Sequence, residues 1–218
     1  MVYGTMAAIS RPYPGTKAMD KDPILTDSDA QVVAALGSRS LVLVGMMGAG
    51  KSSIGRKLAQ RLSLPLVDAD AEIERAAGMS ISDIFDKHGE PYFRAGEARV
   101  IARLLDGGPQ VLATGGGAFM HPQSRDAIRA KGISVWLKAD YDVLMKRIKR
   151  RSDRPMLKTA DPGETLRRLM AERDPVYAEA DVTVMSRDVP HEIIIAEIIS
   201  AVSPRLQEIN APAGARVS

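Results

Sequence analysis

Residues Gly45–Ser52 read Gly-Met-Met-Gly-Ala-Gly-Lys-Ser and follow the apolar run Leu41–Val44. The spacing fits the phosphate-loop pattern, in which glycines let backbone N–H groups turn around phosphate oxygens and the next helix presents its positive end to the anion. A tight left-handed turn between a strand and a helix would also use glycines. The phosphate loop is the better interpretation, because Ile54, Leu58 and Leu62 recur four apart and predict a helix directly after it.

Within this loop two side chains are expected to act on the anion. The ammonium group of Lys51 would reach the β- and γ-phosphates, and the hydroxyl of Ser52 would bind Mg²⁺.

The composition is that of an ordinary globular protein. The chain has 218 residues, of which 45% are hydrophobic and 26% charged, which suits one α/β domain with a lid. No apolar run reaches the length of a membrane span. The net charge of +3 is small, so a nucleic-acid patch would have to be local. The absence of cysteine excludes disulfides, thiolate zinc sites and a cysteine nucleophile, and the cytoplasm is the default expectation.

The two ends of the chain differ in composition from its middle. Residues 1–37 contain few large apolar side chains and are expected to form a loose extension, within which 27–36 could form a short helix. The folded domain is expected over 38–207, with its last helix over 190–206, and residues 208–218 are expected to be a disordered tail.

Five strand-like apolar runs alternate with helical patterns after residue 38. This alternation predicts an α/β fold with a doubly wound, five-stranded parallel sheet between two helical layers, and ligands at the carboxyl ends of the strands. The runs are Leu41–Val44, Pro65–Val67, Val111–Ala113, Ser134–Leu137 and Val182–Met185.

Asp68 and Asp70 follow the second of these runs. In an extended chain residues two apart point the same way, so both carboxylates would face the crevice, one for a metal ion and one for a hydroxyl proton. The alternative is a helix cap beside a solvated acid. The third run ends in Gly115–Gly117 and not in an acid, which leaves Asp68 as the candidate metal ligand. Those glycines imply close backbone approach to a small polar ligand or to a neighbouring segment.

Several arginines are candidates for binding anions. Arg94 lies three residues before Glu97, and Arg173 precedes an Asp-Pro pair. Guanidinium groups bind carboxylates through paired hydrogen bonds, although a surface ion pair is the commoner meaning of such spacing. The basic segment 146–157 could be a lid whose arginine covers the γ-phosphate, or a nucleic-acid patch, but it contains no aromatic residue to stack on a base. The three histidines have no metal-ligand spacing and are given no role.

Taken together, these residues resemble the shikimate kinases, which belong to the nucleoside-monophosphate-kinase-like P-loop group. The resemblance covers about residues 40–206, and its six motifs occur in the family's order. They are GMMGAGKSS at 45–53, LVDAD at 66–70, SISDIFDKHGEPYFRAGE at 80–97, ATGGG at 113–117, RPML at 154–157 and MAERDPVY at 170–177.

The resemblance implies an enzyme that transfers phosphate from ATP, with Mg²⁺, to the 3-hydroxyl of shikimate in aromatic amino acid biosynthesis, with a mobile lid at about 150–163. It implies an ATP site of Gly48, Ala49, Gly50, Lys51, Ser52, Ser53, Arg147, Arg154 and Arg187. It implies a shikimate site of Asp70, Arg94, Gly116, Gly117 and Arg173, with Glu97 supporting Arg94. Ser52 and Asp68 would serve the metal, and the catalytic residues would be Lys51, Asp70 and Arg154.

Three other functions remain open from the sequence. The first is a kinase of the same fold that acts on another small polyol acid such as gluconate, because fold and phosphate loop do not fix the acceptor. The second is a P-loop protein that binds nucleic acid through the basic segment, and the third is a silent ATP-binding regulator. The triple glycine and the two arginines favour shikimate, with ATP and shikimate as the partners, no nucleic acid or membrane, and a monomeric protein.

Overall fold

The sheet of this protein is parallel throughout and has five strands, as predicted. The computed structural model describes residues 25–149 and 161–211. The strands lie in the order β2-β3-β1-β4-β5. They are β1 Ser40–Val44, β2 Leu66–Asp68, β3 Val111–Ala113, β4 Gly132–Lys138 and β5 Val182–Met185. All residues of β1 and β3 are buried, as expected for inner strands covered on both faces.

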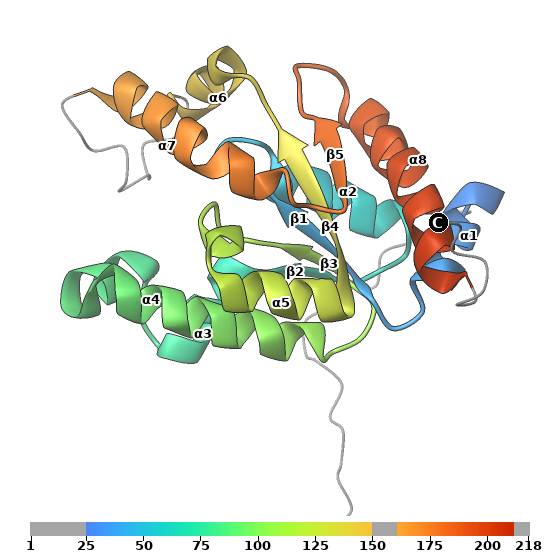
Figure 1. Cartoon of the computed structure of the whole chain (residues 1–218), viewed down its shortest axis with the longest axis horizontal. Coiled ribbons are helices and arrows are strands. Elements are labelled where there is room, and N and C mark those ends of the chain that lie inside the picture. Colours follow the sequence, from blue (N-terminus) through green and yellow to red (C-terminus); the bar gives the residue numbers. More distant parts are fainter. Residues whose placement is uncertain (1–24, 150–160, 212–218) are drawn as a thin grey trace, which may run out of the picture.

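Helices cover both faces of the sheet (Figure 1). Helices α2 and α8 contact each other on one side, where α1 packs on α8, and α4 and α5 contact each other on the other side. The helices are α1 Asp27–Leu36, α2 Lys51–Arg61, α3 Ala69–Ala77, α4 Ile81–Leu105, α5 Pro122–Lys131, α6 Tyr141–Ile148, α7 Pro162–Tyr177 and α8 His191–Asn210, with a 3₁₀ turn η1 at Ala118–Met120. Among the described residues, none of these helices is long and apolar enough to cross a membrane.

Helix α1 occupies 27–36, where the sequence also allowed a short helix, but it packs on α8 and is not part of a loose extension. The side chains of Val32 and Leu36 are buried in the main core, because their spacing of four places both on the side of α1 that packs on α8. Thr26 begins the helix with a capping box to Asp29. Residues 1–24 lie outside the described part of the chain, so the expectation for them stays a prediction.

Smaller corrections concern the ends of elements. The second strand extends to Asp68 and the fourth begins at Gly132, so both differ from the apolar runs that predicted them. The last helix continues to Asn210, and residues 208–210 therefore belong to it and not to a tail. Apolar runs mark the buried middle of an element, whereas hydrogen bonds set its ends.

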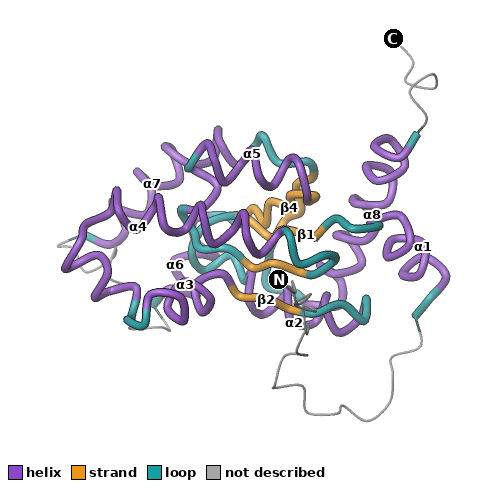
Figure 2. Tube along the Cα trace, turned by 90° about the horizontal axis from the view of Figure 1, so that it is seen from below, coloured by secondary structure: helices purple, strands orange, loops and turns teal. Residues whose placement is uncertain are grey.

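The register of the inner strands brings two glycine-rich loops together. Leu43 of β1 pairs with Ala113 of β3, and Asp68 of β2 pairs with the same Ala113. The segments that follow these three strands therefore leave the sheet at one edge (Figure 2). A side chain at Gly45 would meet the carbonyl oxygen of Leu137 at 2.7 Å, so the loop after β1 needs glycine at its first position.

A buried ion pair holds α1 against α2. The side chain of Asp29 is 2% exposed and its Oδ1 lies 3.0 Å from Nη2 of Arg61. Burial alone would raise the pKa of Asp29, but the hydrogen bonds from Arg61 and Thr26 outweigh it and lower the pKa.

We predict that Asp29→Asn lowers the free energy of unfolding by about 1–3 kcal/mol at neutral pH, because the half-buried guanidinium of Arg61 loses its charged partner. Because folding lowers the pKa of Asp29, the ionised carboxylate stabilises the protein at pH values above the pKa of the unfolded state. This stabilisation is lost as the pH falls through the pKa of the folded state. The difference between variant and wild type should therefore shrink below about pH 4, measured by urea denaturation. Asp27→Asn on the exposed side of α1 is the matched control, and an equal loss in both variants would contradict the assignment.

Candidate active site

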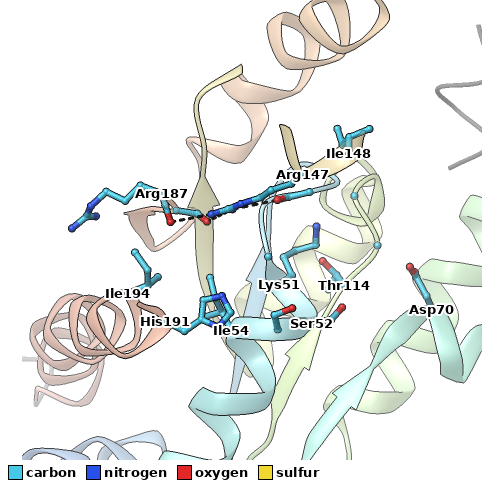
Figure 3. A pocket seen from close by; sticks show the side chains of 16 residues that line it. Lys51, Ser52, Ile54, Asp70, Thr114, Arg147, Ile148, Arg187, His191 and Ile194 are labelled. Carbon is cyan, nitrogen blue, oxygen red and sulfur yellow. Dashed lines mark hydrogen bonds between the residues drawn. The ribbon is translucent and has the colours of Figure 1, made fainter. Parts of the chain in front are cut away.

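The loop that opens α2 has the conformation of a phosphate cradle. Gly48 and Gly50 have φ angles of +84° and +95°, which L side chains rarely adopt. The ammonium group of Lys51 is folded over the loop and donates hydrogen bonds to the carbonyl oxygens of Gly45 at 2.7 Å and Met46 at 3.0 Å. Lys51 and the N-terminus of α2 therefore concentrate positive charge at one point (Figure 3).

A cavity of about 350 Å³ lies over this loop. It collects residues from α2, α3, the segment after β3, α6 and the start of α8. Its lining residues are Gly48, Gly50, Lys51, Ser52, Ser53, Ile54, Asp70, Thr114, Gly115, Gly116, Arg147, Ile148, Ser186, Arg187, His191 and Ile194. Of the loop residues expected to hold ATP, only Ala49 does not line the cavity; it is buried, and its carbonyl accepts a hydrogen bond from Ser186.

Arg147 forms one wall of the cavity. Its guanidinium donates to Oγ of Ser186 at 2.9 Å, to the carbonyl of Gly48 at 3.3 Å and to the carbonyl of Arg187 at 2.9 Å (Figure 3). These bonds connect α6 with both the phosphate loop and the segment after β5. The planar guanidinium is thereby held in one orientation at the cavity wall.

Two residues at the far end of the cavity differ from expectation. The guanidinium of Arg187 is paired with Glu197 and points away from the cavity, so its side chain does not support the expected role in ATP binding (Figure 3). His191 lines the cavity, although the sequence analysis gave it no role. The predicted helix over 190–206 placed His191 at a helix start, but a search for metal-ligand spacing does not show that this start lies at the cavity.

Ser52 and Asp68 meet next to the phosphate loop. Oγ of Ser52 donates to Oδ2 of Asp68 at 3.1 Å, and Oδ1 of Asp68 accepts from the backbone of Asp70 at 3.1 Å and Ala71 at 3.4 Å. Asp68 therefore caps α3 and also faces Ser52. The described residues contain no group of three or more His, Asp or Glu side chains that could hold a metal ion. One hydroxyl and one carboxylate fit Mg²⁺, which keeps most of its positions for phosphate and water oxygens.

Asp70 lies in the first turn of α3 and not in an extended segment. The expectation that Asp68 and Asp70 point the same way along an extended chain is therefore wrong, because the helix begins at Ala69, two residues earlier than that argument assumed. Asp70 still lines the cavity, across from Lys51 (Figure 3).

Each of the three glycines after β3 is packed against a polar partner. A side chain at Gly115 would meet Oδ1 of Asp70 at 2.7 Å and Oε1 of Glu97 at 2.9 Å, and one at Gly117 would fall on the guanidinium of Arg94. Gly116 packs against the backbone nitrogen of Met47 in the phosphate loop. The close approach predicted from the glycines at 115–117 is thus present, because each of them has a neighbour where a side chain would lie.

Arg94 and Glu97 form a buried pair and not a surface ion pair. Nη1 of Arg94 lies 2.7 Å from Oε2 of Glu97, whose side chain is 1% exposed, and Nη2 lies 3.0 Å from Oε1 of Glu90. Burial raises the pKa of Glu97, and Asp70 raises it further, while Arg94 acts against both. The two carboxylates outweigh the burial of Arg94 and raise its pKa, so its guanidinium stays charged. Oε1 of Glu97 is buried without a hydrogen bond partner among the described residues.

Helix α7 also contacts the glycine segment at 115–117, through two side chains that bind the carbonyl of Gly116. The carbonyl of Gly116 accepts hydrogen bonds from Nη1 of Arg173 at 3.1 Å and from the hydroxyl of Tyr177. Tyr177 is fully buried and stacks 5.8 Å from the ring of Trp136. Burial raises the pKa of Tyr177 to about 12, so its hydroxyl remains a donor at neutral pH. The sequence did not single out Tyr177, because one aromatic residue in a helix usually serves packing.

The expected lid lies mostly outside the described residues. Arg154 belongs to this part, so its expected role over the phosphates stays a prediction. The end of the expected lid, at 161–163, includes the N-cap Asp161 and the start of α7.

Comparison with known proteins gives a consistent result. The family model described as shikimate kinase matches residues 47–203. A shikimate kinase of Bradyrhizobium diazoefficiens is 62% identical over 84% of this chain and 89% of its own length. One of Rhodopseudomonas palustris is 64% identical over 79% and 85%. Among solved structures, the shikimate kinase of Acinetobacter baumannii in complex with shikimate has a TM-score of 0.74 and 36% identity, and it covers 78% of this chain and 96% of its own.

We predict that Tyr177→Phe lowers the free energy of unfolding by about 0.5–1.5 kcal/mol, because it removes one hydrogen bond to Gly116 and keeps the aromatic packing. Urea denaturation measures this loss. Tyr141→Phe is the matched control, since the Tyr141 hydroxyl has no hydrogen bond among the described residues. Equal stability of Tyr177→Phe and wild type would contradict the role given to the Tyr177 hydroxyl.

Proposed function

Because the chain belongs to the shikimate kinase family, we propose that its two glycine-rich loops hold ATP and shikimate side by side for direct transfer of the γ-phosphoryl group. The enzyme is a small-molecule kinase that converts ATP and shikimate to ADP and shikimate 3-phosphate. The observation that carries the proposed site is the position of Asp70, whose carboxylate packs on Gly115 and lines the cavity above Lys51.

In this proposal the segment after β3 and the two arginines bind shikimate. Arg94 is held by Glu97 and Glu90, so its guanidinium is fixed before a substrate carboxylate arrives. Arg173 is held in the same way by the Gly116 carbonyl. Among the described residues the backbone N–H groups of Gly116 and Gly117 have no acceptor. These two groups would donate to the oxygens of the acid.

The phosphate loop would bind the triphosphate through its backbone N–H groups and Lys51. The ammonium group of Lys51 would exchange its hydrogen bonds to the carbonyls of Gly45 and Met46 for contacts with the phosphates. There it would stabilise the negative charge that develops on the transferring phosphoryl group. Ser52 and Asp68 would hold Mg²⁺, which neutralises phosphate charge when it is bound. Arg154 would add a further positive charge from the lid.

Asp70 would orient the attacking hydroxyl and accept its proton. A carboxylate can act as the general base in this step, as an aspartate does in protein kinases. The rest of the catalysis is mainly positioning and electrostatic stabilisation. Glu97 also lies next to Gly115, where it would keep Arg94 in place beside Asp70.

The alternatives from the sequence are less well supported. A gluconate kinase would share the fold and phosphate loop, but the family match and the buried Arg94–Glu97 pair favour shikimate. The nucleic-acid and silent-regulator hypotheses have no observation in their favour among the described residues. We further propose a monomer in the cytoplasm, since one chain supplies both the phosphate loop and the arginines.

We predict that Asp70→Asn lowers kcat by about 10²–10⁴-fold, because the amide cannot accept the proton, while the KM for ATP changes little. Steady-state kinetics with both substrates measures the two effects separately. Glu72→Gln, which lies two residues along the same helix and pairs with Arg75, is the control and should keep normal kcat. Wild-type turnover in Asp70→Asn would remove Asp70 from the mechanism.

A further inference from the structure

A second cavity, of about 340 Å³, lies between α3 and α4 and shares no lining residue with the cavity over the phosphate loop. Figure 1 shows these two helices side by side. Its apolar wall includes Ile73, Ile84 and Phe93, which form a small core cluster of their own with Val100 packed against it. The volume lies within the range of small-molecule sites.

Two arginines give this cavity a positive edge. Arg99 and Arg103 line it, are exposed, and lie one turn apart on α4. Neither has an ion pair or hydrogen bond within residues 25–149 and 161–211, whereas Arg75 on the neighbouring helix is paired with Glu72. None of the described residues that line this cavity is acidic. Nη2 of Arg99 lies 3.9 Å from the point that a side chain at Gly96 would occupy, so the guanidinium folds back along the cavity wall.

Like charges at this spacing on a helix repel each other and destabilise it, and an anion held between them would offset the repulsion. A guanidinium binds a carboxylate through two parallel hydrogen bonds, and an apolar wall with an aromatic ring favours a flat ring as the rest of the ligand.

We propose that the cavity between α3 and α4 is a regulatory site for a small aromatic carboxylate. Its ring packs on Phe93 and Val100, and its carboxylate is held by Arg99 and Arg103.

Phe93 connects this cavity to the substrate site. Its ring centroid lies 5.0 Å from Cζ of Arg94, so one ring forms part of the cavity wall and also contacts the arginine proposed to bind shikimate. A ligand that packs on Phe93 therefore changes the environment of Arg94, and the two ligands affect each other's affinity equally. This coupling rests on the proposed role of Arg94, whereas binding in the cavity does not.

The binding is tested by calorimetric titration of trans-cinnamate into the full-length enzyme saturated with shikimate and ADP, which keeps the active site occupied. We expect saturable 1:1 binding that the double variant Arg99→Ala/Arg103→Ala weakens at least tenfold and the control Arg75→Ala leaves unchanged. Cinnamyl alcohol, which lacks the charge, should bind at least tenfold more weakly than cinnamate. Absence of binding at millimolar cinnamate, or equal binding to the double variant, would overturn the proposal.

The coupling is tested by shikimate titrations of the initial rate with and without saturating cinnamate. We expect the half-saturating shikimate concentration to shift at least twofold in the wild type and not in the double variant, while that for ATP stays constant. Cinnamate binding without such a shift would contradict the regulatory role. An unchanged half-saturating shikimate concentration in Arg94→Ala would instead show that the proposed function of Arg94 is wrong. The calorimetric test of cinnamate binding would remain valid in that case, because it does not depend on Arg94.

Discussion

The pairing of β1 with β3 is the constraint on which the rest of the site depends. Both strands are completely buried, and Leu43 faces Ala113 across the ladder, so the phosphate loop and the triple glycine leave the sheet next to each other. Gly116 then packs directly on the backbone of Met47. Transfer of a phosphoryl group needs donor and acceptor within a few ångströms and in line. The sheet supplies this proximity, and the side chains refine it.

The proposed acceptor side contains buried polar groups that hold one another in place. Arg94 is held by Glu97, and the carbonyl of Gly116 is held by Arg173 and Tyr177. Such groups are expensive to bury unless they are paired. Against this background, the buried Oε1 of Glu97 and the N–H groups of Gly116 and Gly117 are exceptions, because they have no hydrogen bond partner among the described residues. An unsatisfied polar atom in an otherwise satisfied interior is the expected mark of a binding site.

The parts that could be predicted from the sequence are those encoded locally. The phosphate loop is one continuous motif, and the alternation of buried strands with helices is enough for the parallel sheet. The packing of α1 against the domain could not be predicted, because it depends on contacts between residues that are far apart in the chain, such as Asp29 and Arg61. Tyr177 and His191 were missed for the same reason, since the hydrogen bond of Tyr177 to Gly116 and the position of His191 at the cavity arise only after folding. Asp70 was identified by an argument that placed the start of α3 two residues too late.

The central claim is that one site brings together a triphosphate and shikimate. It is tested most directly by a coupled ADP-release assay of the purified protein with ATP and Mg²⁺, in which shikimate, gluconate and no acceptor are compared in parallel. The account predicts ADP release that depends on shikimate and stays at the background level with gluconate. Release with gluconate but not with shikimate would contradict the assignment of Arg94, Arg173 and the triple glycine to the acceptor.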